Sequence, residues 1–287
     1  MTSPPAGPDI FAGQPGDPDL LAEIYDLEHD EVTADLAFYR LLTANDRGRV
    51  LDLGCGSGRL FHALFEGGAT ALTGVDGSPA LLRRAEARIA GDPLLATAQA
   101  ASRIELVPGD VRRPPVHGRF RTIVLAGVLP HLAGPEDALR ALQAANRLLD
   151  RPGRLVLDDI GPAGLPWRDL PYSVDWDREM KGERVVRRSQ LTRRDTPEGL
   201  RVDYLTLTDT VRPDGTIARL PASFHLWYPS RVVLEQLLDA AGFAVELTYG
   251  SHDLDPFQET SERRIVIARR APGETKQEPR RRRTGKG

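Results

Sequence analysis

The sequence contains a single cysteine, Cys55, which excludes an intramolecular disulfide and any metal site built from several cysteines. Residues 1–20 lack both a basic start and an apolar run, which argues against a secretory signal peptide. No later segment approaches the roughly 20 consecutive apolar residues that a membrane-spanning helix needs. These absences predict a cytoplasmic protein that has no membrane anchor.

The sequence also lacks a strong overall charge. Its 38 Lys and Arg and its 41 Asp and Glu leave a formal net charge of −3, which provides no general attraction to nucleic acid or to an anionic membrane. The exception is the segment 271–287, which contains Arg280–Arg283 in one run and no aromatic residue. We predict a disordered basic tail there, and tethering to RNA or to a membrane is the alternative.

Short apolar segments alternate with segments of helical periodicity through the first half of the chain. Residues 20–42 carry apolar side chains at helical spacing, which predicts one or two helices ahead of the core. Five strands are then predicted, at residues 50–53, 71–75, 104–107, 122–125 and 155–157. Because these strands are apolar throughout and have helices between them, they indicate an α/β fold with a doubly wound, mostly parallel sheet covered on both faces.

The pattern changes after Gly161. Period-two runs at 184–195, 200–211 and 216–228 are separated by turn residues, which predicts an antiparallel β insertion after the fifth strand. A helix at 229–241 and strands at 244–249 and 264–268 then complete the sheet. The predicted parts are a leader and lid (1–45), a core (46–160), an insertion for substrate binding or homodimer formation (161–228), the rest of the core (229–270) and the tail (271–287).

The sharpest local signal is the turn from Asp52 to Gly58, with the pattern D-x-G-x-G-x-G between a strand and a helix. Its glycines permit positive φ and let the backbone approach a ligand at the carboxyl end of a strand, where open α/β sheets bind ligands. Asp76 ends the next strand, where a carboxylate can accept both hydroxyls of a ribose. These residues predict an adenosine site; the alternative is a tight turn without a ligand.

The spacing of the glycines differs from that of a dinucleotide site. Such sites usually carry G-x-G-x-x-G and leave the helix amino terminus free for a pyrophosphate. Here an acid, Asp52, opens the turn, and its charge would repel phosphate but attract the ammonium group of an amino acid. An NAD-dependent oxidoreductase therefore remains only as a minor alternative.

Five segments taken in order, VLDLGCGSG, GVDGSP, PGDVRRPP, RTIVLAGVLPHL and PGRLVLDD, resemble the motifs of the class I S-adenosylmethionine-dependent methyltransferases. The resemblance implies a seven-stranded sheet with a reversed final strand and S-adenosyl-L-methionine as cofactor. It implies that Asp52 and the glycine turn hold the methionine part, that Asp76 holds the ribose, and that Asp110 and Val111 meet the adenine. The full predicted cofactor set is Tyr25, Asp52, Gly54, Cys55, Gly56, Gly58, Asp76, Gly77, Asp110, Val111, Leu125 and Ala126. Gly77 departs from the family, which often has an apolar residue there to pack on adenine.

Tyr25, His131 and the antiparallel insertion resemble features of small-molecule N-methyltransferases, including those that act on amino sugars of antibiotic pathways. The implied reaction is direct displacement of the methyl group by an amine nitrogen. Methylation of oxygen or carbon, methylation of RNA or protein, and a non-catalytic binding module are the alternatives. The chain lacks the Asn/Asp-Pro-Pro-Tyr/Phe motif that grips the amino groups of bases, so we expect a small-molecule acceptor and no nucleic acid partner.

Two residues are the candidates for catalysis. His131 follows the fourth strand and can accept a proton near neutral pH, although a loop histidine can equally pack on the cofactor. Tyr25 would cover the cofactor or orient the nucleophile, and its alternative is a place in a helix core. For the acceptor we predict contacts from His131, Asp159, Trp167, His225 and Trp227. One histidine with nearby acids, as at His252, is a weak metal signal, so we expect no metal.

Overall fold

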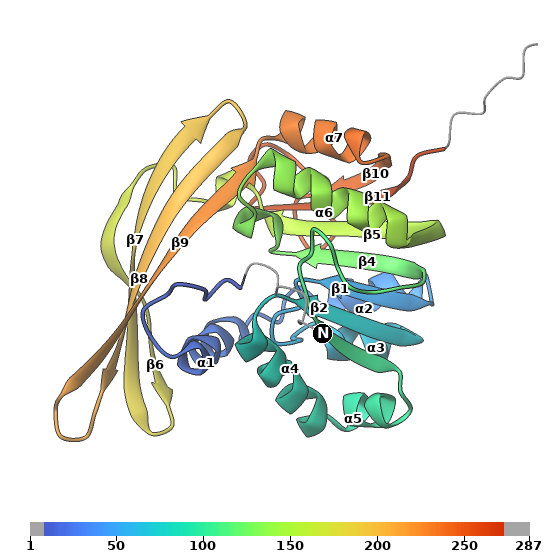
Figure 1. Ribbon diagram of the computed structural model, residues 1–287. Helices are drawn as coiled ribbons and strands as arrows, with labels where there is room; N and C mark the ends of the chain where they lie inside the picture. Colours follow the sequence, from blue (N-terminus) through green and yellow to red (C-terminus); the bar gives the residue numbers. More distant parts are fainter. Residues whose placement is uncertain (1–8, 273–287) are drawn as a thin grey trace, which may run out of the picture.

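The computed structural model describes residues 9–272, so residues 1–8 of the predicted leader and residues 273–287 of the predicted tail lie outside it. Two β-sheets organise the chain, with α1 (Pro18–His29) between them (Figure 1). Within the described residues, no helix is long and apolar enough to cross a membrane.

The larger sheet has seven strands in the order β10-β11-β5-β4-β1-β2-β3. The pairs among β1 to β5 are parallel, whereas β11 runs antiparallel to both β5 and β10. This confirms the predicted doubly wound sheet with a reversed final strand. The strands are β1 (Arg49–Leu53), β2 (Ala71–Asp76), β3 (Ile104–Pro108), β4 (Phe120–Ala126), β5 (Leu149–Ile160), β10 (Phe243–Tyr249) and β11 (Arg263–Arg270).

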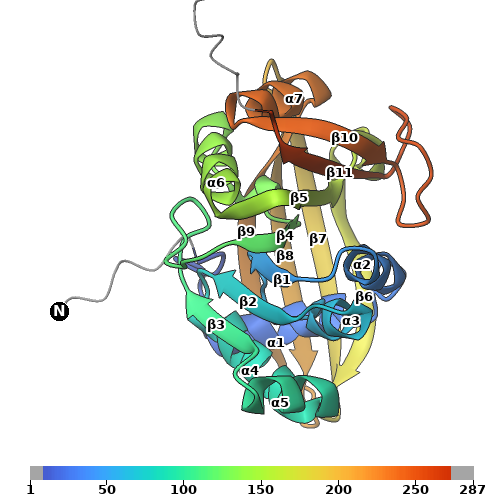
Figure 2. The ribbon, with the colours of Figure 1, turned by 90° about the vertical axis from the view of Figure 1, so that its right-hand side faces the viewer.

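Helices cover both faces of this sheet (Figure 2). One face packs against α6 and α7, and the other against α2 to α5. Ser78 caps α4 by accepting from the backbone N–H of Leu81, with Pro79 in the first turn, as the sequence predicts. The helices are α2 (Leu36–Ala44), α3 (Phe61–Gly67), α4 (Pro79–Gly91), α5 (Pro93–Ala100), α6 (Pro135–Leu148) and α7 (Arg231–Ala240), with short 3₁₀ turns η1 (Leu129–His131) and η2 (Pro162–Gly164).

Helix α5 is an element that the sequence reading missed. Asp92 caps it by accepting from the backbone N–H groups of Leu94 and Leu95, and Pro93 lies in its first turn. The helix has only eight residues, of which Leu95 and Ala98 are buried. Two buried positions are too few to give a clear helical period.

The smaller sheet is antiparallel, in the order β6-β7-β8-β9. Its strands are β6 (Leu170–Met180), β7 (Glu183–Thr196), β8 (Gly199–Val211) and β9 (Ile217–Pro229). The sequence predicted three of these strands, and the prediction was wrong in leaving out β6. Pro171 argues against a strand, because proline lacks the N–H that strand pairing uses. β6 accommodates it because the strand lies at the edge of the sheet, where a missing N–H costs no ladder hydrogen bond.

Candidate functional site

The glycine turn after β1 forms a bare backbone surface. Gly54, Gly56 and Gly58 have φ values of 80°, 55° and 74°, a region that favours glycine. The N–H groups of Gly54 and Cys55 donate to the carbonyl of Val75 at 2.7 and 3.1 Å, which fixes the turn against the end of β2. A Cβ on Gly54 would lie 2.5 Å from Cγ2 of Val128, so any side chain at this position would displace a neighbour.

The carboxylate of Asp76 is fixed by two backbone donors. The N–H of Gly56 donates to Oδ2 and the N–H of Ser78 donates to Oδ1, both at 2.8 Å. Burial raises the pKa of Asp76, while these hydrogen bonds oppose the shift. Each carboxylate oxygen keeps a lone pair free, so Asp76 can still accept from a ligand.

The glycine turn and Asp76 border a cavity of about 270 Å³, which we call the turn cavity. Seven of the predicted cofactor residues line it, namely Tyr25, Gly54, Gly56, Asp76, Gly77, Val111 and Ala126. Five do not, namely Asp52, Cys55, Gly58, Asp110 and Leu125.

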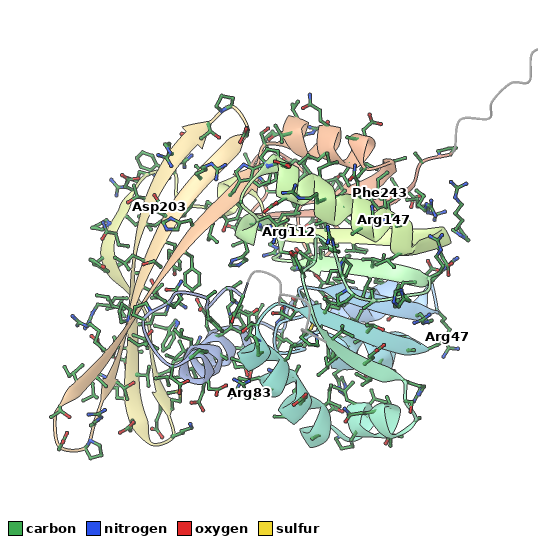
Figure 3. The ribbon with its side chains drawn as sticks, viewed as in Figure 1. Arg47, Arg83, Arg112, Arg147, Asp203 and Phe243 are labelled. Carbon is green, nitrogen blue, oxygen red and sulfur yellow. The ribbon has the colours of Figure 1, made fainter. Side chains whose placement is uncertain are left out.

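Packing explains why several of these five do not line the turn cavity. Leu125 is fully buried in the core, and Sγ of Cys55 would lie 2.9 Å from a Cβ on Gly74, inside the sheet. Gly58 packs under Phe61. The carboxylate of Asp110 is held by the guanidinium of Arg112, which lies on the side of the larger sheet that faces β9 (Figure 3).

Asp52 is a buried acid without a matching cation. It is 2% exposed, and burial together with the charge of Asp76 raises its pKa to about 7, against the opposing charge of Arg59. The guanidinium of Arg59 is bound to the carboxylate of Asp35 at 2.8 and 2.5 Å and is therefore only partly available to Asp52. Asp52 would thus gain from a positively charged ligand group at the turn.

A second cavity, of about 460 Å³, lies between α1 and the smaller sheet, and we call it the sheet cavity. Ile10, Tyr25, His131 and Phe224 line both cavities, so the two share a wall. Most of the other lining residues are apolar side chains, which come from α1, from the strands of the smaller sheet, and from the segments that precede α1 and connect β5 to β6. The chain therefore places a large, mostly apolar space beside the glycine turn.

The predicted catalytic residues meet at this shared wall. His131 lines both cavities and is exposed, and the protein groups around it together with the charge of His29 lower its pKa to about 4. The phenol of Tyr25 faces the turn, since its hydroxyl would be 3.3 Å from a Cβ on Gly56. Burial raises the pKa of Tyr25. Near pH 7 His131 is therefore a neutral imidazole and Tyr25 a neutral phenol.

Sequence reasoning missed His29, which also lines the sheet cavity. Its ring stacks on Tyr25 with centroids 4.1 Å apart, and its Nδ1 lies 2.8 Å from the carbonyl oxygen of Tyr25. Burial lowers the pKa of His29. A signal was available, because His29 follows Tyr25 by four residues and shares its face of the helix.

The two tryptophans predicted to wall the acceptor site lie elsewhere, and this prediction was wrong. Trp227 is fully buried in the core with Leu234 and Leu238, while its neighbours Leu226 and Tyr228 line the sheet cavity. Successive strand residues point to opposite faces, which explains the difference. Trp167 is 79% exposed and lies outside the lining of both cavities.

Of the two remaining residues predicted to contact the acceptor, His225 lines a cavity and Asp159 does not. His225 lines the turn cavity, and its Nδ1 lies 2.6 Å from Oδ1 of Asp203, which is on the smaller sheet (Figure 3). Asp159 lines neither cavity; it is 3% exposed, and burial raises its pKa to about 7 against the charge of Arg264. We correct the prediction that Asp159 contacts the acceptor, because the fold buries it in the core.

Asp158 is occupied by neighbouring side chains. It accepts from the hydroxyl of Tyr39 at 2.6 Å, contacts Nε2 of His252 at 2.8 Å, and pairs with Arg263. Burial would raise the pKa of Asp158, but these partners together hold it below its usual value. This network ties α2 to β5, β11 and the loop that follows β10.

Comparison with known proteins agrees with this geometry. Residues 50–153 match a family model described as a methyltransferase domain, and this range contains the glycine turn, Asp76 and the five parallel strands up to the start of β5. Over these residues the chain is similar to the methyltransferase domains of the class I S-adenosylmethionine-dependent enzymes. S-adenosylmethionine is the cofactor of this class, so the turn cavity is the place to test for it.

Curated relatives match part of the chain. The tRNA U34 carboxymethyltransferase of Shewanella frigidimarina is 34% identical over 113 residues, which cover 39% of this chain and 31% of that protein. The protein of the same name from Shewanella loihica gives the same identity and coverage. The methyltransferase domain thus spans about a third of the length of these relatives.

Solved structures resemble nearly the whole chain. The CcbJ methyltransferase from Streptomyces caelestis superposes with a TM-score of 0.68 at 20% identity, covering 88% of this chain and 96% of the other. The sugar N-methyltransferase KedS8 from Streptoalloteichus sp. ATCC 53650 gives a TM-score of 0.68 at 20% identity, covering 95% and 98%. At such identities the likeness establishes the fold, including the antiparallel insertion.

Proposed function

We propose that this protein transfers a methyl group from S-adenosylmethionine to an amine nitrogen of a small-molecule acceptor by direct displacement. The observation that carries the proposal is the shared wall: the turn cavity and a larger, mostly apolar cavity meet at Tyr25 and His131. A donor in the first and an acceptor in the second would be neighbours, which is the arrangement that an in-line transfer requires.

The residues of the turn cavity fit the cofactor. The bare backbone of Gly54 and Gly56 admits a ligand at close range, and Asp76 offers two fixed acceptors to a pair of hydroxyls. Asp52 does not line the cavity, but it stands directly before the glycine turn and would attract an ammonium group there through its charge. When bound, the cofactor supplies an already activated methyl group, so the protein mainly positions the reactants and excludes water.

His131 is proposed to accept the proton that the acceptor nitrogen releases. Its lowered pKa keeps the imidazole neutral at pH 7, so a lone pair is available at one ring nitrogen. The same lowered pKa makes it a weak base, so it contributes only where the amine is already close to losing its proton. Tyr25 is proposed to cover the cofactor from α1 and to hold His29 in place by stacking.

The solved structures support an amine acceptor, because KedS8 is a sugar N-methyltransferase and a further neighbour, CalS10 from Micromonospora echinaspora, is an amino pentose methyltransferase. The latter superposes with a TM-score of 0.63 at 21% identity and covers 86% of this chain and 97% of its own. The tRNA-modifying relatives match 39% of this chain and 31% of their own length, so they carry little information about the acceptor.

The test is incubation with S-adenosylmethionine labelled in its methyl group and a panel of amines, phenols and indoles. We expect label in amine products and release of the demethylated cofactor in equal amount. If only phenols or carbon nucleophiles are methylated, the proposal that the acceptor atom is an amine nitrogen is wrong. If calorimetry detects no binding of S-adenosylmethionine or of its demethylated product, the methyltransferase proposal as a whole is wrong.

A further inference from the structure

The floor of the sheet cavity is a regular grid, because three adjacent strands face it. In one row Leu191, Tyr204 and Phe224 lie side by side on β7, β8 and β9. The next rows place Ser189 beside Thr206 and Arg187 beside Thr208. Polar side chains thus gather at the β7 and β8 corner of the floor, and apolar side chains occupy the rest.

The reacting end of the cavity lies at the opposite edge of this grid. Phe224 of β9 borders both cavities, and its ring centroid is 6.4 Å from that of His131. Asp175 of β6 lies beyond β7 in the sheet, and β6 is three strands away from β9. Neighbouring strands are about 4.8 Å apart, so the strand that carries Asp175 lies about 14 Å from the strand that carries Phe224.

The polar corner has an excess of negative charge. The guanidinium of Arg187, on β7, pairs with Glu28 of α1 and lies 3.7 Å from Asp175 of β6. Asp175 also accepts a hydrogen bond from Ser189 at 2.6 Å. All four residues line the cavity, and one guanidinium serves two carboxylates. The corner therefore favours a ligand group that donates hydrogen bonds and carries positive charge.

The stretch between the shared wall and this corner offers little to a polyhydroxylated molecule. Its lining includes Leu21, Ile24, Leu220 and Ala222, whereas Leu191 lies level with Phe224, and Val202 and Leu226 lie on the side of Phe224 away from the corner. Each hydroxyl of a sugar ring placed against these side chains would lose water without gaining a partner, whereas methylene groups would gain from burial.

We propose that the acceptor is an amine with an apolar body that carries a second cationic group about 14 Å from the methylated nitrogen, the distance spanned by three strand spacings. The apolar body lies along Leu21, Leu220 and Ala222, and the distal cation meets Asp175 and Glu28. This inference rests on the proposed methyl transfer and adds the chemical class of the acceptor.

Calorimetry tests the inference without turnover, using the protein saturated with demethylated cofactor. The probes are straight-chain α,ω-diamines, monoamines of equal length and a hexosamine. A diamine that spans the cavity is expected to bind about tenfold more tightly than the equally long monoamine. This is the gain in affinity expected from one charge-assisted hydrogen bond between the second ammonium group and the polar corner. Each methylene removed from the monoamine is expected to weaken binding about fourfold.

Two variants test whether the preference for the diamine arises at Asp175. Asp175→Asn is expected to abolish the preference for the diamine, while Asp177→Asn, on the same strand but paired with Arg184 outside the cavity, keeps it. Tighter binding of the hexosamine than of any diamine, or a preference that survives in Asp175→Asn, overturns the inference. If diamines bind as expected but label is never transferred to any amine, the proposed function fails and the binding site stands.

Discussion

Replacing Asp52 by asparagine is expected to make the cofactor-free protein more stable at high pH. Asp52 is 2% exposed and has a pKa of about 7 in the folded chain, compared with 3.8 for a solvated aspartate. Because the folded pKa lies above the unfolded one, the folded state favours the protonated acid. Stability from this group is therefore complete below pH 3.8 and is lost as the pH rises toward 7.

The size of the effect follows from the two pKa values. The difference between the folded and unfolded pKa of Asp52 lowers the free energy of unfolding by about 1.7 kcal/mol at pH 5 and about 4 kcal/mol at pH 8, as an order-of-magnitude figure for a buried group. Asparagine keeps the shape and carries no charge, so it avoids this cost. The difference in the free energy of unfolding between variant and wild type is expected to grow by about 2.5 kcal/mol between these pH values.

The assay is urea denaturation of both proteins without cofactor, at pH 5 and pH 8. Other titrating groups are common to the two proteins and cancel in the difference. Asp46→Asn is the control, because Asp46 pairs with Arg121 and its loss is expected to destabilise the protein. A variant that is less stable than wild type at pH 8, or a difference that does not change with pH, refutes the reasoning.

The same substitution is expected to weaken cofactor binding. An ammonium group beside ionised Asp52 recovers much of the cost of ionisation, and a charge-assisted hydrogen bond contributes about 1.5 to 3 kcal/mol. Asp52→Asn therefore reduces affinity for S-adenosylmethionine about tenfold to a hundredfold in calorimetry at pH 8. Unchanged affinity would show that Asp52 does not interact with the cofactor and affects only the stability of the protein.

Three further substitutions test other parts of the site. His131→Ala is expected to lower kcat about a hundredfold, the lower end for a general base because of the low pKa, and an unchanged kcat would exclude the role. Gly54→Ala is expected to reduce cofactor affinity measurably, since the new Cβ meets Val128 at 2.5 Å and φ is 80°; equal affinity would show that the turn adapts. Trp227→Ala is expected to lower the free energy of unfolding by about 3 to 5 kcal/mol without a selective change in KM, and a KM effect in a fully stable variant would restore Trp227 to the acceptor site.

The sequence alone determined the sheet and the region of the cofactor site. Apolar strands alternating with helices leave few arrangements other than a doubly wound sheet, and the glycine turn lies next to Asp76 because parallel strands end at one edge. These features depend on neighbours in the chain and on the period of apolar residues, both of which can be read directly. The short helix α5 was not predicted because its apolar pattern is brief, and the edge strand β6 was not predicted because a proline interrupts its pattern.

The tertiary structure decided which side chains face the acceptor. Trp227 and Tyr228 are adjacent in sequence, yet one fills the core and the other lines the sheet cavity, because a one-residue step along a strand reverses the direction of the side chain. The polar corner joins Glu28 of α1, Asp175 of β6 and Arg187 of β7, which no local pattern connects. Charge pairing between distant segments depends on how the smaller sheet lies against α1, and only the folded chain fixes that placement.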